Sequence, residues 1–286
     1  MKKIVALLCV VVALWGCSQS AGTKSKTMVV SILPLQYIVE NIVGDDFAIE
    51  TIVPPGASPE TYEPTPAQME QVERAEMIFA VGVMGFEQAT VERMSSTAQG
   101  RYVALAGIAE SHTECVHHDH SHGEHHHHGG VNPHLWTSPD MLMVMAERAY
   151  NAISAAYPDS TKYTLAYEEL MQRLCSLDSL VAERCAELPS RAFVIYHPTF
   201  QYLADRYGLT EIAIENHGKE PSVDHLRKVV DRARELGARK VFYQREFPRS
   251  VVATVASELG VEAEQVDILS ADVEGMIVDF VDKLQK

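Results

Sequence analysis

The chain has 286 residues and carries 24 lysines and arginines against 39 aspartates and glutamates, which gives a formal net charge of −15 at pH 7. This acidic balance argues against a nucleic acid as partner and favours solubility and the attraction of cations. The roughly 260 residues that follow the N-terminal segment are enough for two modest α/β lobes or one large domain.

The first 17 residues have the layout of an export signal. Two lysines precede an apolar run, Ile4 to Trp15, that is short for a membrane span and typical of a secretory signal. The run ends in Leu14-Trp15-Gly16-Cys17, which resembles a bacterial lipobox, so we expect Cys17 to be acylated and to anchor the chain to a membrane. A cleaved signal with an incidental cysteine is the alternative. Residues 18–27 are small and polar and suit a flexible tether.

Residues 28–157 alternate short apolar runs with helical patterns. Short strands separated by helices indicate a mostly parallel sheet, and we assign this stretch to an N-terminal lobe. The segment Pro54 to Pro59 is too rich in proline for the interior of a helix or sheet. The predicted strands are 28–33, 49–53, 77–81 and 102–105, and the predicted helices are 35–43, 66–74 and 86–94.

A low-complexity insert at 112–130 interrupts this alternation. Nine of the 13 histidines lie between His112 and His128, mixed with acidic residues and followed by two glycines. Many imidazoles with a few carboxylates give weak, exchanging metal sites, which weaken below about pH 6 because only neutral imidazole binds metal. A hydrophilic loop without a function is the alternative. The predicted accessory capture residues are His117, His118, His120, His122, His125, His126, His127 and His128.

The longest helical pattern runs from Pro158 to Leu188. Its apolar residues recur at spacings of three, four or seven, and about 30 residues of helix would extend about 45 Å. We interpret 158–189 as a spine that joins two lobes. Cys175 and Cys185 lie about 15 Å apart along this helix, too far for a disulfide, and nothing else in the sequence indicates a disulfide framework.

Residues 190–286 resume the alternation and form the predicted C-terminal lobe. The fold class that follows is α/β, with two mostly parallel α/β lobes joined by one long spine helix. The predicted strands are 193–196, 211–214, 240–243 and 263–268, and the predicted helices are 200–207, 223–236, 249–259 and a last one from about 273.

Three residues outside the insert are candidate metal ligands. His197 directly follows a predicted strand and precedes Pro198, His134 lies just before a helix, and Glu60 lies in a proline-rich loop that also follows a strand. Loops at the carboxyl ends of strands are where α/β folds bind ligands. Each residue alone would more often be structural or solvated, but two imidazoles and one carboxylate together suit Zn²⁺ or Mn²⁺.

Several segments, in chain order, resemble the metal-binding receptors of bacterial zinc and manganese ABC importers, a family with a helical backbone between two lobes. The resemblance covers nearly the whole mature chain. Its segments are Ser31 to Leu35, Pro54 to Thr65, Asn132 to Trp136, Tyr196 to Phe200, Glu220 to Ser222 and the region around Asp267. Many zinc-type members also carry a histidine-rich insert before the Asn-Pro-His segment.

The resemblance implies an extracytoplasmic receptor, periplasmic and tethered as a membrane lipoprotein. It implies that the protein is a monomer and not an enzyme, and that it binds Zn²⁺, with Mn²⁺ as the alternative. It also implies delivery of the metal to an ABC permease. The sequence contains no G-x-x-x-x-G-K-[ST] motif, so ATP hydrolysis would belong to a partner ATPase.

The chain departs from the family's pattern at the first ligand, where Glu60 replaces the usual histidine. This change gives a harder, anionic ligand and weakens the argument for zinc over manganese. The family's fourth ligand is commonly an aspartate near the C-terminus or water, and Asp267 and Asp272 are both candidates. Gln244 stands where many relatives carry a glutamate, and His217 matches no ligand position.

Two other functions use the same residues. A metal-dependent hydrolase could be built from two histidines, a carboxylate and an open position, but the sequence has no H-E-x-x-H or G-x-S-x-G motif and no obvious general base. A surface lipoprotein acting as an adhesin or metal scavenger would share the site, and only a neighbouring permease and ATPase gene pair would distinguish it from a transport receptor.

Overall fold

The computed structural model describes residues 26–91, 102–107, 132–216, 219–247 and 249–286. The export signal with Cys17, the tether up to residue 25, the histidine-rich insert up to residue 130 and His217 lie outside these ranges. None of the helices within them combines the length and apolar character that crossing a membrane requires.

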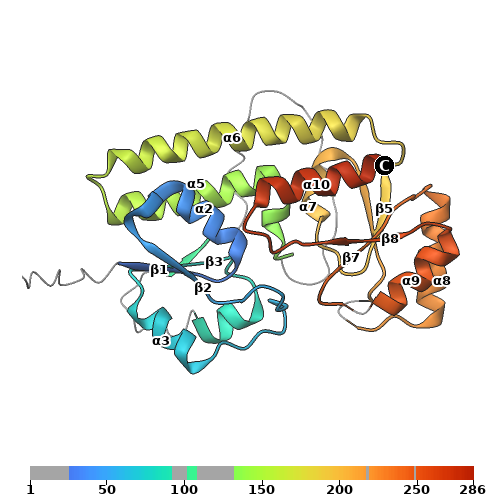
Figure 1. The fold of residues 1–286 in the computed structure, drawn as a ribbon, viewed down its shortest axis with the longest axis horizontal. Coiled ribbons are helices and arrows are strands. Elements are labelled where there is room, and N and C mark those ends of the chain that lie inside the picture. Colours follow the sequence, from blue (N-terminus) through green and yellow to red (C-terminus); the bar gives the residue numbers. More distant parts are fainter. Residues whose placement is uncertain (1–25, 92–101, 108–131, 217–218, 248) are drawn as a thin grey trace, which may run out of the picture.

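The first lobe contains a four-stranded parallel sheet in the order β2-β1-β3-β4 (Figure 1). Every pairing is parallel, as the alternation of strands and helices predicts. The central strand β3 is buried along its whole length, which explains its uninterrupted apolar sequence. The strands are β1 (Thr27–Val30), β2 (Ala48–Thr51), β3 (Met77–Ala80) and β4 (Tyr102–Ala104).

Helices α2 (Leu33–Val43), α3 (Pro66–Arg74) and α5 (Pro139–Ala156) belong to this part of the chain. Each begins with a proline in its first turn, where the missing N–H costs nothing. Thr65 and Gln68 form a reciprocal capping box at the start of α3. The helix predicted at 86–94 is, within the described residues, a short π-helical segment, Glu87–Val91.

The second lobe repeats the same arrangement. Its four parallel strands follow the order β6-β5-β7-β8, which matches the first sheet position by position. The predicted fold class is therefore confirmed. The elements are β5 (Ala192–Ile195), α7 (Gln201–Tyr207), β6 (Thr210–Ala213), α8 (Val223–Glu235), β7 (Val241–Gln244), α9 (Arg249–Leu259), β8 (Ala263–Val266) and α10 (Val273–Gln285).

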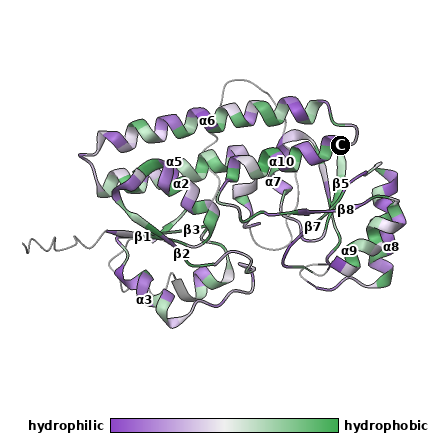
Figure 2. Cartoon of the chain, viewed as in Figure 1, coloured by the Kyte–Doolittle hydropathy of each residue, from purple (hydrophilic) through white to green (hydrophobic). Residues whose placement is uncertain are grey.

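Helix α6 (Thr161–Ala186) runs along both lobes (Figure 1). Its 26 residues extend about 39 Å at the α-helical rise per residue, and the helix starts three residues later than predicted. It packs against α5 and α2 of the first lobe and α10 and α7 of the second. Hydrophilic and hydrophobic residues alternate along it (Figure 2), because only one face is buried.

The two cysteines of α6 differ in state. Cys185 is a buried free thiol, whereas Cys175 is disulfide-bonded, so the two are not joined to each other, in agreement with their spacing. Nothing in the sequence indicates a disulfide, so the one at Cys175 was not predicted. Its bonding partner is not among the described residues, in which the only other cysteine, Cys185, is free. The spacing of residues along α6 could not predict this bond.

One hydrophobic core continues from the first lobe into the second. It joins Met28 and Phe79 of the first sheet, Leu174 of α6, and Phe193 and Phe280 of the second lobe. A separate core lies between the second sheet and helices α8 and α9. Helix α6 therefore packs against both lobes and does not only connect them.

We expect Leu174→Ala to lower the free energy of unfolding by about 2–5 kcal/mol, because the side chain is fully buried and its removal leaves a cavity. The matched control is Leu165→Ala on the same helix, where the side chain is 61% exposed and the loss should stay within about 0.5 kcal/mol. Urea unfolding followed by circular dichroism measures both. Equal losses would contradict a core shared through α6.

Candidate metal centre

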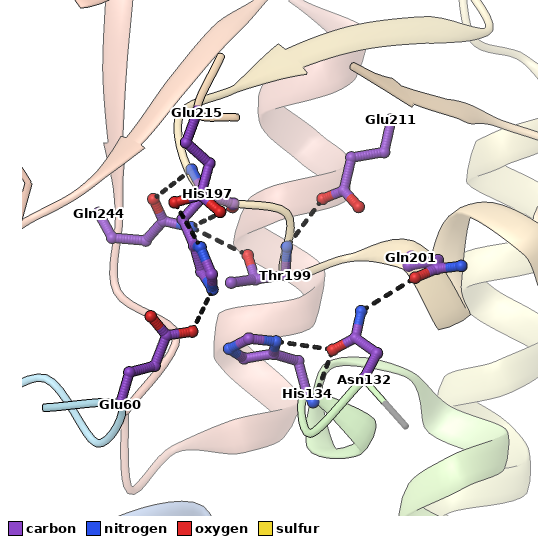
Figure 3. Close-up of polar contacts among 9 residues, drawn as sticks. All are labelled: Glu60, Asn132, His134, His197, Thr199, Gln201, Glu211, Glu215 and Gln244. Atoms are coloured by element: carbon purple, nitrogen blue, oxygen red, sulfur yellow. Dashed lines mark hydrogen bonds and ion pairs between the residues drawn. The ribbon is translucent and has the colours of Figure 1, made fainter. Parts of the chain in front are cut away.

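Glu60, His134 and His197 converge although 137 residues separate the first from the last. One ligand atom from each lies within 4.8 Å of the others. Glu60 comes from the loop between β2 and α3, His134 immediately precedes a 3-10 turn before α5, and His197 follows β5 (Figure 3). The two histidines are buried, whereas the side chain of Glu60 is 35% exposed to solvent.

The loop that carries Glu60 leaves the carboxyl end of β2. The N–H groups of Ile52 and Val53 donate to the carbonyls of Val30 and Ser31, so the chain stays in register with β1 up to the first proline. Gly56, with φ of 83°, then turns the chain. These features direct the loop towards the second lobe instead of extending the sheet.

Asn132 sets the orientation and the tautomer of the His134 ring. Its Oδ1 accepts the backbone N–H of His134 at 3.0 Å and lies 2.8 Å from the ring Nδ1. An amide oxygen only accepts, so Nδ1 carries the proton and Nε2 keeps its lone pair. Burial, together with the neighbouring His197, holds the pKa of His134 well below its usual range. His134 is therefore neutral near pH 7, the form that binds a metal.

His197 lies between two carboxylates. Its Nε2 is 2.5 Å from Oε1 of Glu60, and its Nδ1 is 2.9 Å from Oε2 of Glu215 (Figure 3). Burial acts to lower the pKa of His197, but the contacts with Glu215 and Glu60 outweigh it and raise the pKa to about 9. Nε2, which faces Glu60 and the His134 ring, is the atom available to a metal.

The backbone around His197 is fixed by buried polar side chains. Gln244 donates from Nε2 to the carbonyl of His197 at 2.7 Å and to Oγ1 of Thr199 at 3.1 Å. Glu211 accepts the N–H groups of Thr199 and Phe200, and burial raises its pKa to about 7 against the opposing effect of these two donors. In the family that the sequence resembles, many members carry a glutamate at the position of Gln244. An ionised carboxylate could only accept hydrogen bonds, whereas the amide of Gln244 can both donate and accept.

Hydrogen bonds between the lobes hold the His134 segment in place. Thr137 donates from Oγ1 to the carbonyl of Thr199 at 2.7 Å, and Trp136 donates from Nε1 to the carbonyl of Ile268 at 2.7 Å. The hydroxyl of Tyr202 donates to the carbonyl of Asn132 at 2.9 Å. These bonds flank both histidines and limit their relative movement.

Asp267 and Asp272 are not brought into the group formed by Glu60 and the two histidines. Asp272 caps α10 by accepting the N–H of Gly275 at 2.9 Å, and Asp267 accepts the N–H of Leu269 at 3.2 Å. The residue that the sequence reasoning missed is Glu215. One available signal was its place directly after the predicted strand 211–214.

Two α/β lobes bridged by a long helix, with two imidazoles and a carboxylate meeting between them, define a two-lobe metal-binding fold. The family model described as "Zinc-uptake complex component A periplasmic" matches residues 28–286, and the chain belongs to this family. The resemblance inferred from the sequence motifs is thereby confirmed.

Individual relatives agree with this assignment. The chain is 27% identical over 290 residues to the "Zinc-binding lipoprotein AdcA" of Streptococcus pneumoniae, covering 95% of this chain and 56% of that protein. It is 28% identical over 286 residues to the "High-affinity zinc uptake system protein ZnuA" of Bacillus subtilis, covering 94% and 84%. The chain thus spans about half the length of the AdcA proteins it matches.

Solved structures show the same fold. A crystal structure of ZnuA superposes with a TM-score of 0.79 at 28% identity, covering 92% of this chain and 98% of the other. The periplasmic zinc binding protein TroA from Treponema pallidum superposes with a TM-score of 0.76 at 18% identity, covering 91% and 98%. At 18% identity the second match supports the fold alone.

We expect metal affinity to rise with pH up to about 9. Because both carboxylates keep His197 protonated below that pH, a metal at Nε2 must displace a proton, and affinity falls by up to about tenfold per pH unit as the pH drops. Calorimetric Zn²⁺ titrations at pH 7.5, in buffers of different ionisation enthalpy, should show about one proton released per metal. Affinity independent of pH between 6 and 9 would contradict this.

Proposed function

We propose that this chain is an extracytoplasmic receptor that binds Zn²⁺ through Glu60, His134 and His197 and delivers it to the permease of an ABC importer. The observation that carries the proposal is the convergence of these three ligand atoms within 4.8 Å, from loops of both lobes. The names of the relatives, which are zinc-binding and zinc-uptake proteins, support the choice of cargo. Mn²⁺ is the alternative cargo, favoured by the hard oxygen ligand at Glu60.

The donor set suits a four-coordinate zinc ion with one position left open. Two imidazole nitrogens and one carboxylate oxygen supply three ligands, and Glu60 neutralises one of the two positive charges. Among the described residues, neither Asp267 nor Asp272 joins the group of ligand atoms formed by Glu60 and the two histidines, so we propose that water fills the fourth position in preference to either aspartate. The partly exposed Glu60 is the side from which the ion enters and leaves.

Capture and release follow from where the ligands are attached. Glu60 belongs to the first lobe and His197 to the second, so an ion bound to both bridges the lobes. The shared core and the bonds made by Thr137 and Trp136 favour small shifts over a wide hinge motion. Release to the permease therefore requires movement of the exposed Glu60 loop more than separation of the lobes.

Cys17 and the histidine-rich insert lie outside the described residues, and we propose a role for each. Cys17 would carry the lipid that keeps the receptor at the membrane surface, and the insert at 112–130 would collect metal through weak sites and pass it to the central one. We propose that the receptor acts as a monomer, because one chain provides all three ligands.

We expect His134→Ala and His197→Ala each to weaken the tightest Zn²⁺ site by more than the roughly 10–100-fold that changes around a metal ligand cost, because each removes a ligand. The control is His225→Ala, a histidine on α8 that is not in the group. Chelator competition with the purified mature protein measures the affinities. An unchanged tight site in both ligand variants would refute the site.

Replacing the carboxylate ligand tests the choice of metal. Glu60→His supplies a softer, neutral nitrogen, so we expect the ratio of Zn²⁺ affinity to Mn²⁺ affinity to rise, whereas Glu60→Gln should weaken both metals through loss of the charge. Competition titrations with the two ions on the three proteins give these ratios. An unchanged ratio in Glu60→His would show that Glu60 does not influence metal choice.

A further inference from the structure

Glu215 is a buried carboxylate beside His197 that contributes no atom to the ligand group. Only 8% of its side chain is exposed, and its Oε2 lies 2.9 Å from Nδ1 of His197. Glu60 contacts the opposite ring nitrogen, Nε2 (Figure 3). The imidazole ring therefore separates the two carboxylates, and Glu215 lies on the side of the ring away from the ligand position.

The sheet register explains this placement. In the parallel pairing of β5 with β6, Ile195 lies opposite Ala213. Beyond the strands the pairing continues, since the N–H of Glu215 donates to the carbonyl of Tyr196 at 3.0 Å. Two residues past the Ile195–Ala213 pair, His197 and Glu215 leave neighbouring strands at the same edge and on the same face of the sheet.

We propose that Glu215 is a positioning residue for metal binding, which accepts a hydrogen bond from Nδ1–H of His197 and so leaves the Nε2 lone pair facing the ion. This inference rests on the proposed function, and it assigns a role to a residue that is not a ligand. A carboxylate in this place fixes the tautomer and orientation of the ring and makes the imidazole a stronger donor.

The two histidines of the site are oriented by different groups. Nδ1 of His134 faces the neutral amide oxygen of Asn132, whereas Nδ1 of His197 faces a carboxylate. Glu60 and Glu215 together place two negative charges around a site for a divalent cation, so the loaded centre is electrically balanced. The charge on Glu215, and not only its oxygen, should therefore contribute to affinity.

Two substitutions separate the charge from the hydrogen bond. Glu215→Gln keeps an acceptor oxygen of the same shape without the charge, and Glu215→Leu removes both. With Zn²⁺ as the probe in chelator competition on the mature protein, we expect affinity to fall about 10-fold for Glu215→Gln and about 100-fold for Glu215→Leu. The control, Glu220→Gln, removes an exposed carboxylate five residues away and should bind as the unmodified protein does.

A spectroscopic measurement distinguishes positioning from general structural support. In the zinc-loaded protein, ¹H–¹⁵N NMR of the histidine rings should show a His197 Nδ1–H proton protected from exchange, shifted in Glu215→Gln and absent or unprotected in Glu215→Leu. If Glu215→Leu does not fold, as judged by circular dichroism, the isosteric Glu215→Gln alone decides through its affinity and its shift.

Wild-type affinity and an unchanged Nδ1–H signal in the Glu215 variants would overturn this inference while leaving the ligand assignment intact. Unchanged binding in His197→Ala would instead refute the proposed site itself, so the two failures are distinguishable.

Discussion

The hydrophobic core shared along α6 is the constraint on which the candidate metal centre depends. Ligands that lie far apart in sequence can meet within 4.8 Å only if the two sheets are held at a constant separation. Phe280 of α10 stacks on Phe200 with ring centroids 3.7 Å apart and also contacts Phe193. The loop that carries His197 is thus anchored in the same core that supports the first lobe.

Electrostatics at the centre is arranged around His197. Its ring contacts carboxylates on both nitrogens, while His134 is held neutral by burial and oriented by an amide. Under the proposed function, a divalent ion takes the place of the proton between His197 and Glu60, so that one positive charge replaces another at these residues. Such binding would need little rearrangement, because the three candidate ligand atoms already lie within 4.8 Å of one another.

The two lobes share one strand order but use it differently. In each sheet the second strand in chain order forms an edge, and loops that follow β2 and β5 bring Glu60 and His197 together. The first lobe contributes a proline-rich loop with a partly exposed candidate ligand, Glu60, and the second contributes His197, whose carbonyl accepts a hydrogen bond from Gln244. The two candidate ligands therefore differ in environment: Glu60 is partly exposed, whereas His197 is buried and its backbone is hydrogen-bonded to Gln244.

The sequence by itself determined the α/β class, the eight strands, the spine helix and the three candidate ligands, because strand and helix periodicity and loops after strands are local signals. It also predicted Asp267 and Asp272 as ligand candidates, and their hydrogen bonds to nearby N–H groups appear only in three dimensions. Which side chains surround His197 was decided by tertiary structure alone. Glu215 and Gln244 reach it from neighbouring parallel strands, and such pairings join residues 18 and 47 positions away that no local pattern connects.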